Sequence, residues 1–110
     1  MTAPARYELQ IDLGPRSYPI VIGEGLLADA ELLTRHVAAR DVLVVTNATV
    51  GPLYLSMLQQ GLEGKRVRAV TLPDGEQHKT LAVLGRVFDA MVEALLNRDA
   101  LVVALGGGVV

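Results

Sequence analysis

The stretch Asp41-Val42-Leu43-Val44-Val45-Thr46 is almost continuously apolar and rich in β-branched residues. Because side chains on a strand alternate between the two faces of a sheet, an unbroken apolar run predicts a strand buried on both faces. Such strands are typical of parallel sheets that helices cover on both sides. Residues 67–72 are the next expected strand, and residues 100–105 are the last, which is again apolar throughout. We therefore expect a parallel sheet that contains these three segments.

Helical spacing of apolar residues separates the expected strands. It predicts helices over residues 25–39, over 51–60, and from about Thr80, a suitable N-cap, to about Asn97. Alternating helices and strands of this length indicate a Rossmann-like α/β fold with helices on both faces of the sheet.

The chain opens with a different pattern. Apolar and polar residues alternate from Tyr7 to Leu13, and a turn signal at Gly14-Pro15-Arg16-Ser17 precedes a second short apolar run over 18–22. A period of two around a turn predicts a β-hairpin at the entrance of the fold.

The bulk composition bounds the class of protein. With 110 residues, 51% of them hydrophobic and 20% charged, the chain can bury one core, so we treat 1–110 as one domain. A net charge of -2 argues against nucleic acid as a partner. The chain has no Cys and no apolar run of the roughly 18 residues that a membrane helix needs. We expect a soluble cytoplasmic protein.

The final run Leu105-Gly106-Gly107-Gly108-Val109-Val110 would normally lead into a helix, so we expect the natural chain to continue.

Three polar or glycine-rich segments follow the expected strands: Thr46 to Thr49, Pro73 to Lys79, and Gly106 to Gly108. Ligands of open parallel sheets bind beyond the carboxyl ends of the strands, so all three could share one ligand edge. The glycines could let a phosphate approach the backbone, or they could form a tight turn that needs positive φ.

Each of the other two segments also allows two interpretations. In the loop from Pro73 to Lys79, the carboxylates could bind ribose hydroxyls and Lys79 could pair with a phosphate. The loop could equally be solvated, with Glu76 helping to cap the next helix. Asn47 and Thr49 could reach an adenosine ribose, or they could form an Asx-type turn before the next helix. His36, which we expect on the surface, and His78 are not spaced as metal ligands. The chain contains no self-sufficient active site.

These segments resemble the 3-dehydroquinate synthase family. The similarity rests on Leu72-Pro73-Asp74-Gly75-Glu76-Gln77-His78-Lys79-Thr80, and on Ala104 to Val110, which the family continues into Gly-Asp and a helix. The family's opening hairpin is similar to Arg16-Ser17-Tyr18-Pro19-Ile20. Its first nucleotide strand and the helix after it are similar to Val44-Val45-Thr46-Asn47 followed by Pro52-Leu53-Tyr54.

The resemblance implies an enzyme that converts 3-deoxy-D-arabino-heptulosonate 7-phosphate to 3-dehydroquinate and phosphate in the shikimate pathway. It implies catalytic use of NAD, a divalent metal (zinc or cobalt), and a homodimeric full-length enzyme. By the same resemblance, the NAD-binding residues are Asn47, Asp74, Gly75, Glu76, Gln77, His78, Lys79, Gly107, Gly108, Val109 and Val110. The metal ligands and the residues that hold the sugar-phosphate substrate belong to a later all-helical domain that is absent from these 110 residues. We therefore expect no catalytic or metal-binding residue here and no activity of the chain alone.

Two alternatives stay open at this point. Other sugar-phosphate cyclases and glycerol-type metal-dependent dehydrogenases share the front domain, although the dehydrogenases generally lack the Asp-Gly-Glu-Gln-x-Lys loop. A non-catalytic nucleotide-binding module belongs to a different class.

Overall fold

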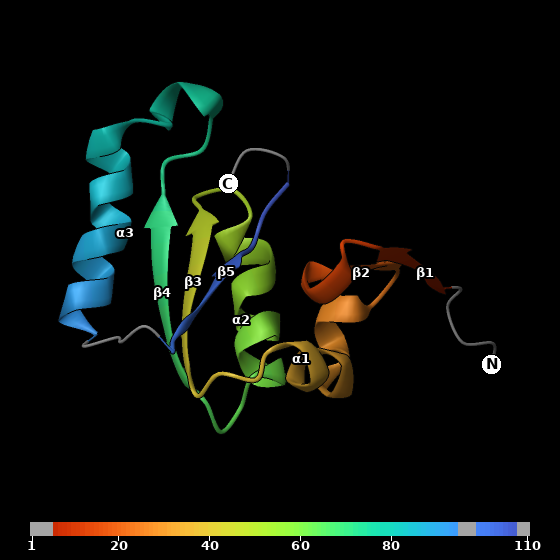
Figure 1. Cartoon of the computed structure of the whole chain (residues 1–110). Helices are drawn as coiled ribbons and strands as arrows, with labels where there is room; N and C mark the ends of the chain where they lie inside the picture. Colours follow the sequence, from red (N-terminus) through yellow and green to blue (C-terminus); the bar gives the residue numbers. More distant parts are fainter. Residues whose placement is uncertain (1–5, 95–98, 108–110) are drawn as a thin grey trace.

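The computed structural model describes residues 6–94 and 99–107. Its elements follow the expected order of a hairpin and then alternating helices and strands (Figure 1). They are β1 (Arg6–Ile11), β2 (Tyr18–Gly23), α1 (Ala30–His36), β3 (Asp41–Asn47), α2 (Gly51–Gly61), β4 (Arg66–Leu72), α3 (Leu81–Glu93) and β5 (Leu101–Ala104), with short 3-10 turns η1 (Gly14–Arg16), η2 (Leu26–Ala28) and η3 (Glu76–His78).

The central sheet has the strand order β4-β3-β5. Strand β3 pairs in parallel with β4 from Asp41↔Arg66 to Asn47↔Leu72, and with β5 from Val42↔Leu101 to Val45↔Ala104. Because β3 has a neighbour at each edge and helices over both faces, all of its residues from Val42 to Asn47 are buried. The predicted parallel sheet is confirmed.

The alternating side chains of β3 divide the core in two. Val42 and Val44 pack with Leu58 and Leu62 of α2 in one cluster. Leu43 and Val45 pack with Val87 of α3 in the other. Figure 1 shows the same division, with α3 on one side of the sheet and α1, α2 and the hairpin on the other. The predicted helices on both faces are therefore confirmed.

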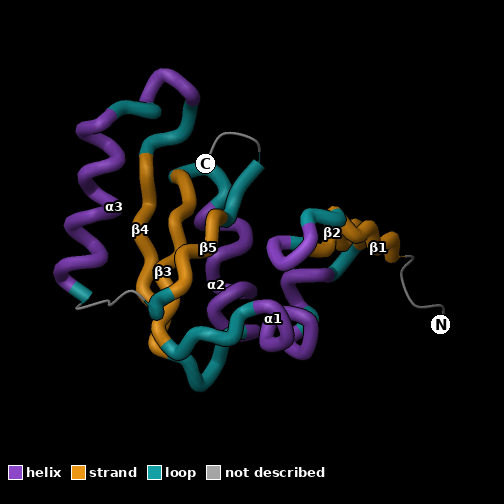
Figure 2. The backbone as a smooth tube through the Cα atoms, viewed as in Figure 1, coloured by secondary structure: helices purple, strands orange, loops and turns teal. Residues whose placement is uncertain are grey.

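The hairpin is confirmed, and β1 pairs antiparallel with β2 from Arg6↔Gly23 to Ile11↔Tyr18. The tube in Figure 2 shows it as a two-stranded unit beside α1. Its Arg6 guanidinium forms an ion pair of 2.7 Å with Asp29. Within the described residues, none of the helices is long and apolar enough to cross a membrane.

The single helix predicted over residues 25–39 is wrong. The structure has η2 and α1, separated by Asp29, whose backbone is extended and whose carboxylate accepts the N–H of Leu32 at 3.1 Å. This helix-capping hydrogen bond from Leu32, followed by that from Arg6, lowers the pKa of Asp29. Apolar spacing runs through Asp29 without interruption, so periodicity did not reveal that a new helix starts there. Helix α3 ends at Glu93, and residues 95–98 of its predicted end lie outside the described residues.

Candidate functional site

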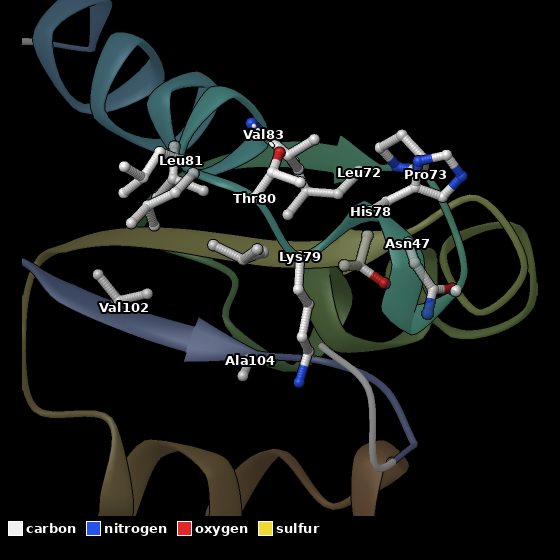
Figure 3. A pocket seen from close by; sticks show the side chains of 15 residues that line it. Asn47, Leu72, Pro73, His78, Lys79, Thr80, Leu81, Val83, Val102 and Ala104 are labelled. Atoms are coloured by element: carbon white, nitrogen blue, oxygen red, sulfur yellow. Dashed lines mark hydrogen bonds between the residues drawn. The ribbon is translucent and has the colours of Figure 1, made fainter.

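A pocket with a volume of about 570 Å³ opens at the carboxyl ends of the three parallel strands, beside the start of α3 (Figure 3). Its floor and walls are mostly apolar, and its polar side chains come from the loops after β3 and β4. It is lined by Val45, Thr46, Asn47, Leu72, Pro73, Gly75, His78, Lys79, Thr80, Leu81, Val83, Leu84, Val87, Val102 and Ala104. The edge predicted from the three strand-end segments is therefore hollow and accessible.

The loop after β4 contains a turn at Gly75 and ends at a helix cap. Gly75 has φ +114°, a backbone conformation that residues with a side chain rarely adopt, and it leads into η3. The N–H of His78 donates to the Gly75 carbonyl at 3.1 Å, which closes the turn. Thr80 caps α3 by accepting the N–H of Val83 at 3.2 Å, as predicted.

The predicted loop residues are not all on the pocket wall. Gly75, His78 and Lys79 line it, and in Figure 3 the Lys79 side chain extends across it toward the strand that carries Ala104. Asp74 and Gln77 are exposed but are not among the lining residues. The side chain of Glu76 lies outside the described part of the structure.

Asn47 lies at the end of β3 with only 7% of its surface exposed, and it lines the pocket. Its Oδ1 accepts the N–H groups of Thr49 at 3.1 Å and Val50 at 2.7 Å, which is the Asx-type turn that the sequence left as an alternative. Its Nδ2 donates to Asp74 Oδ1 at 3.3 Å. The amide group of Asn47 thus has local partners on both of its ends.

The glycine run leaves β5 at the same edge. The Leu105 N–H donates to the Val45 carbonyl at 2.9 Å, and the buried hydroxyl of Thr46 donates to the Leu105 carbonyl at 2.8 Å. These two bonds fix the point where the glycines begin. Thr46 belongs to a segment that the sequence singled out, but a role for its hydroxyl depends on a partner 59 positions away and is not visible in the sequence.

Gly107 has no evident structural requirement for glycine. Its φ does not lie in the left-handed region, and a Cβ built on it would meet no atom within 4 Å. The tight-turn alternative, which needs positive φ, is therefore not what Gly107 adopts. Gly108, Val109 and Val110, also predicted to contact a cofactor, lie outside the described residues.

The arrangement can bind a ligand that combines a flat apolar part with an anionic part. The apolar side chains of β3, β5 and α3 offer a surface for a ring, while Lys79 and backbone N–H groups can meet oxygens of a phosphate. Among the described residues, no group of three His, Asp or Glu side chains could hold a metal ion. The side chains that line the pocket therefore suit binding of such a ligand.

Comparisons with known proteins point to one family. A family model described as the N-terminal part of 3-dehydroquinate synthase matches residues 69–110. The chain is 53% identical over 102 residues to a 3-dehydroquinate synthase of Nitrosococcus oceani. The aligned residues make up 93% of this chain and 28% of that protein. A relative of the same name from Pseudomonas entomophila is 54% identical over 102 residues, with the same shares covered. The chain thus spans 28% of the length of the curated relatives it matches.

Proposed function

Since this chain belongs to the 3-dehydroquinate synthase family, whose N-terminal part it matches, we propose that it is the NAD-binding portion of such an enzyme. The whole protein would convert 3-deoxy-D-arabino-heptulosonate 7-phosphate to 3-dehydroquinate and phosphate in the shikimate pathway, in the cytoplasm and as a homodimer. NAD would accept and return a hydride in that reaction. A divalent metal, zinc or cobalt, would be held by residues outside this chain, as would the sugar-phosphate substrate.

The residues on the pocket edge would divide the work of binding. Lys79 extends into the pocket and would pair with pyrophosphate oxygens, while the apolar wall formed by Leu81, Leu84 and Val102 would accept a ring. Gly107 would let the backbone approach the pyrophosphate, because a glycine leaves its N–H unshielded. The chemistry and the position of the pocket both support a dinucleotide as the proposed ligand.

The observation that carries this proposal is Gly107. A side chain there would strain neither the backbone nor the packing of the described residues, so the described part of the fold does not by itself explain a glycine. A ligand in contact with the backbone does explain it, because any Cβ would occupy the space of the approaching phosphate. Gly107 follows β5, whose Val102 and Ala104 line the pocket, although Gly107 itself is not a lining residue.

We predict that Gly107→Ala weakens NAD binding without lowering stability. A clash or a lost backbone contact should reduce affinity about 10-fold, whereas the free energy of unfolding should stay within about 0.5 kcal/mol of the parent value. NAD titration followed by amide NMR shifts measures the first quantity, and urea unfolding measures the second. An unchanged affinity for NAD would remove the main support for the proposal.

Lys79→Met provides a second test with a matched control. The chain's other lysine, Lys65, donates to the Ala39 carbonyl at the opposite end of the sheet. Both substitutions remove one positive charge, so an effect of net charge alone would be similar for the two. We expect Lys79→Met to lower NAD affinity about 5- to 30-fold, from the loss of one charge-assisted contact, and Lys65→Met to leave it within about 2-fold.

The chain alone should form no dehydroquinate when assayed with the heptulosonate phosphate, NAD and zinc or cobalt. Turnover by the purified chain would contradict the division between a cofactor domain here and a catalytic domain elsewhere. Turnover of a different sugar phosphate by the whole protein would favour another cyclase, and NAD binding without any cyclase activity of the whole protein would favour a non-catalytic module.

A further inference from the structure

We propose that Thr49 and Asp74 are positioning residues that form a clasp between the turn after β3 and the loop after β4, and that Asp74 does not itself contact the ligand. The clasp is the set of side-chain hydrogen bonds among Asn47, Thr49 and Asp74. This inference rests on the proposed function, because it assigns a role to the loop that would bind NAD.

The Asp74 carboxylate is held at both oxygens. Its Oδ2 accepts the Thr49 hydroxyl at 2.5 Å, and its Oδ1 accepts the Asn47 amide at 3.3 Å. The Asn47 amide cannot turn without cost, because its carbonyl oxygen already accepts the N–H groups of Thr49 and Val50. The Asn47 amide therefore presents its hydrogen to the carboxylate from a fixed position, and the Thr49 hydroxyl donates to the other oxygen.

The clasp turns Asp74 away from the pocket. Pro73 and Gly75, its two chain neighbours, line the pocket, whereas Asp74 does not. The carboxylate of Asp74 thus faces the turn after β3, while its two chain neighbours form part of the pocket wall. Holding the Asp74 side chain in this way also restrains the backbone that leads from Asp74 into Gly75.

Gly75 explains why such a restraint is needed. A glycine with φ +114° has access to many other conformations, so the turn into η3 is not rigid by itself. Lys79 is four residues beyond Gly75, and its reach into the pocket depends on the path of that turn. The clasp would hold the turn in the binding conformation before the ligand arrives, which reduces the ordering cost of binding.

The fold should survive loss of the clasp. The Ala48 N–H donates to the Leu72 carbonyl at 3.0 Å, so a backbone hydrogen bond still joins the two segments when the Thr49 hydroxyl is removed. Thr49 and Asp74 are both exposed, so neither substitution opens a cavity. Far-UV circular dichroism of each variant checks this directly.

A double-mutant cycle with Thr49→Val and Asp74→Ala tests the inference in the 110-residue chain. The measured quantities are NAD affinity and hydrogen exchange of the His78 amide, whose N–H closes the turn on Gly75. We expect each single variant to weaken NAD binding about 5-fold and to speed His78 exchange about 10-fold, and the double variant to do no more than Asp74→Ala alone. Thr49→Ser keeps the hydroxyl and should restore parent values.

Each other outcome overturns the clasp. If the effects on affinity are additive, or if Asp74→Ala weakens NAD binding and Thr49→Val does not, Asp74 contacts the ligand directly. If Thr49→Val leaves His78 exchange unchanged, or Thr49→Ser fails to restore it, the hydroxyl does not position the loop. If the parent chain binds no NAD, the proposed function fails, while the cycle on His78 exchange still decides whether the clasp exists.

Discussion

The buried hydroxyl of Thr46 offers a direct measure of how firmly the glycine run is attached to the sheet. Thr46 has an exposed fraction of 0%, and its Oγ1 donates to the Leu105 carbonyl at 2.8 Å. Thr46→Val replaces that hydroxyl with a methyl group of similar size. The packing of β3 is retained, while the only change at the Leu105 carbonyl is the loss of this donor.

The expected cost follows from the environment of that carbonyl. Leu105 is buried, with 8% of its surface exposed, so water cannot readily replace the lost donor. A buried acceptor left without its partner lowers stability by about 1–3 kcal/mol. The higher strand preference of Val offsets roughly a few tenths of a kcal/mol of this loss. We therefore expect Thr46→Val to lower the free energy of unfolding by about 1–2 kcal/mol. With a urea m-value near 1.5 kcal/mol/M, the midpoint should fall by about 1 M.

Thr34→Val is the matched control. Thr34 also donates its hydroxyl to a backbone carbonyl, that of Ala30 at 2.7 Å, but on the exposed surface of α1, where water can take its place. Its midpoint should shift by less than about 0.3 M. Urea unfolding is followed by far-UV circular dichroism, because the chain has no Trp. Equal midpoint shifts in the two variants would refute the reasoning, since burial of the carbonyl would then make no difference.

Further predictions concern the core, the loop and the capped helix. Leu43→Ala, at a side chain with an exposed fraction of 0%, should lower the free energy of unfolding by about 2–5 kcal/mol, whereas Val102→Ala, at a side chain that is 46% exposed, should cost less than about 1 kcal/mol in the same urea experiment. Gly75→Ala should cost about 1–2 kcal/mol and speed amide exchange in the loop, because φ is +114° and the new Cβ would lie 2.5 Å from Gln77 Oε1; unchanged exchange would contradict this. The pKa of Asp29 is lowered from its ordinary value of 3.8, so the ionised carboxylate should stabilise the fold at pH values above 3.8. This stabilisation should be lost as the pH falls below 3.8 and through the folded-state pKa. Asp29→Asn should therefore flatten the pH dependence of the urea midpoint in that acidic range, and an unaltered pH profile would contradict the assignment.

The sheet could be predicted because its signal is local and redundant. The apolar run from Val42 to Val45 contains enough β-branched residues to indicate a strand covered on both faces, and the structure buries each of these residues. The break at Asp29 could not be predicted in the same way. It depends on a capping hydrogen bond to Leu32 and on an ion pair with Arg6, which is 23 positions away, while the apolar spacing around it continues unchanged.

The candidate site was predictable as an edge but not as a set of directed side chains. Parallel strands bring their carboxyl ends together, so the segments after β3, β4 and β5 had to share one edge. Whether Asp74 faces the pocket or the turn after β3 depends on the donors Thr49 and Asn47, which only the folded chain brings within reach. That Asn47 uses its carbonyl oxygen in an Asx turn was one of two interpretations, and the geometry of the turn selects it.

The direction of Asp74 has an electrostatic consequence for an anionic ligand. The chain as a whole carries a net charge of -2, and the loop after β4 contributes two of its carboxylates. Yet the described side chains that line the pocket include Lys79 and His78 and no Asp or Glu. The carboxylate of Asp74 is turned toward Thr49 and Asn47, whereas Lys79 lines the pocket and extends into it. If the clasp acts as proposed, the hydrogen bonds that orient Asp74 keep its negative charge off the described pocket wall and so favour an anionic ligand that they do not contact.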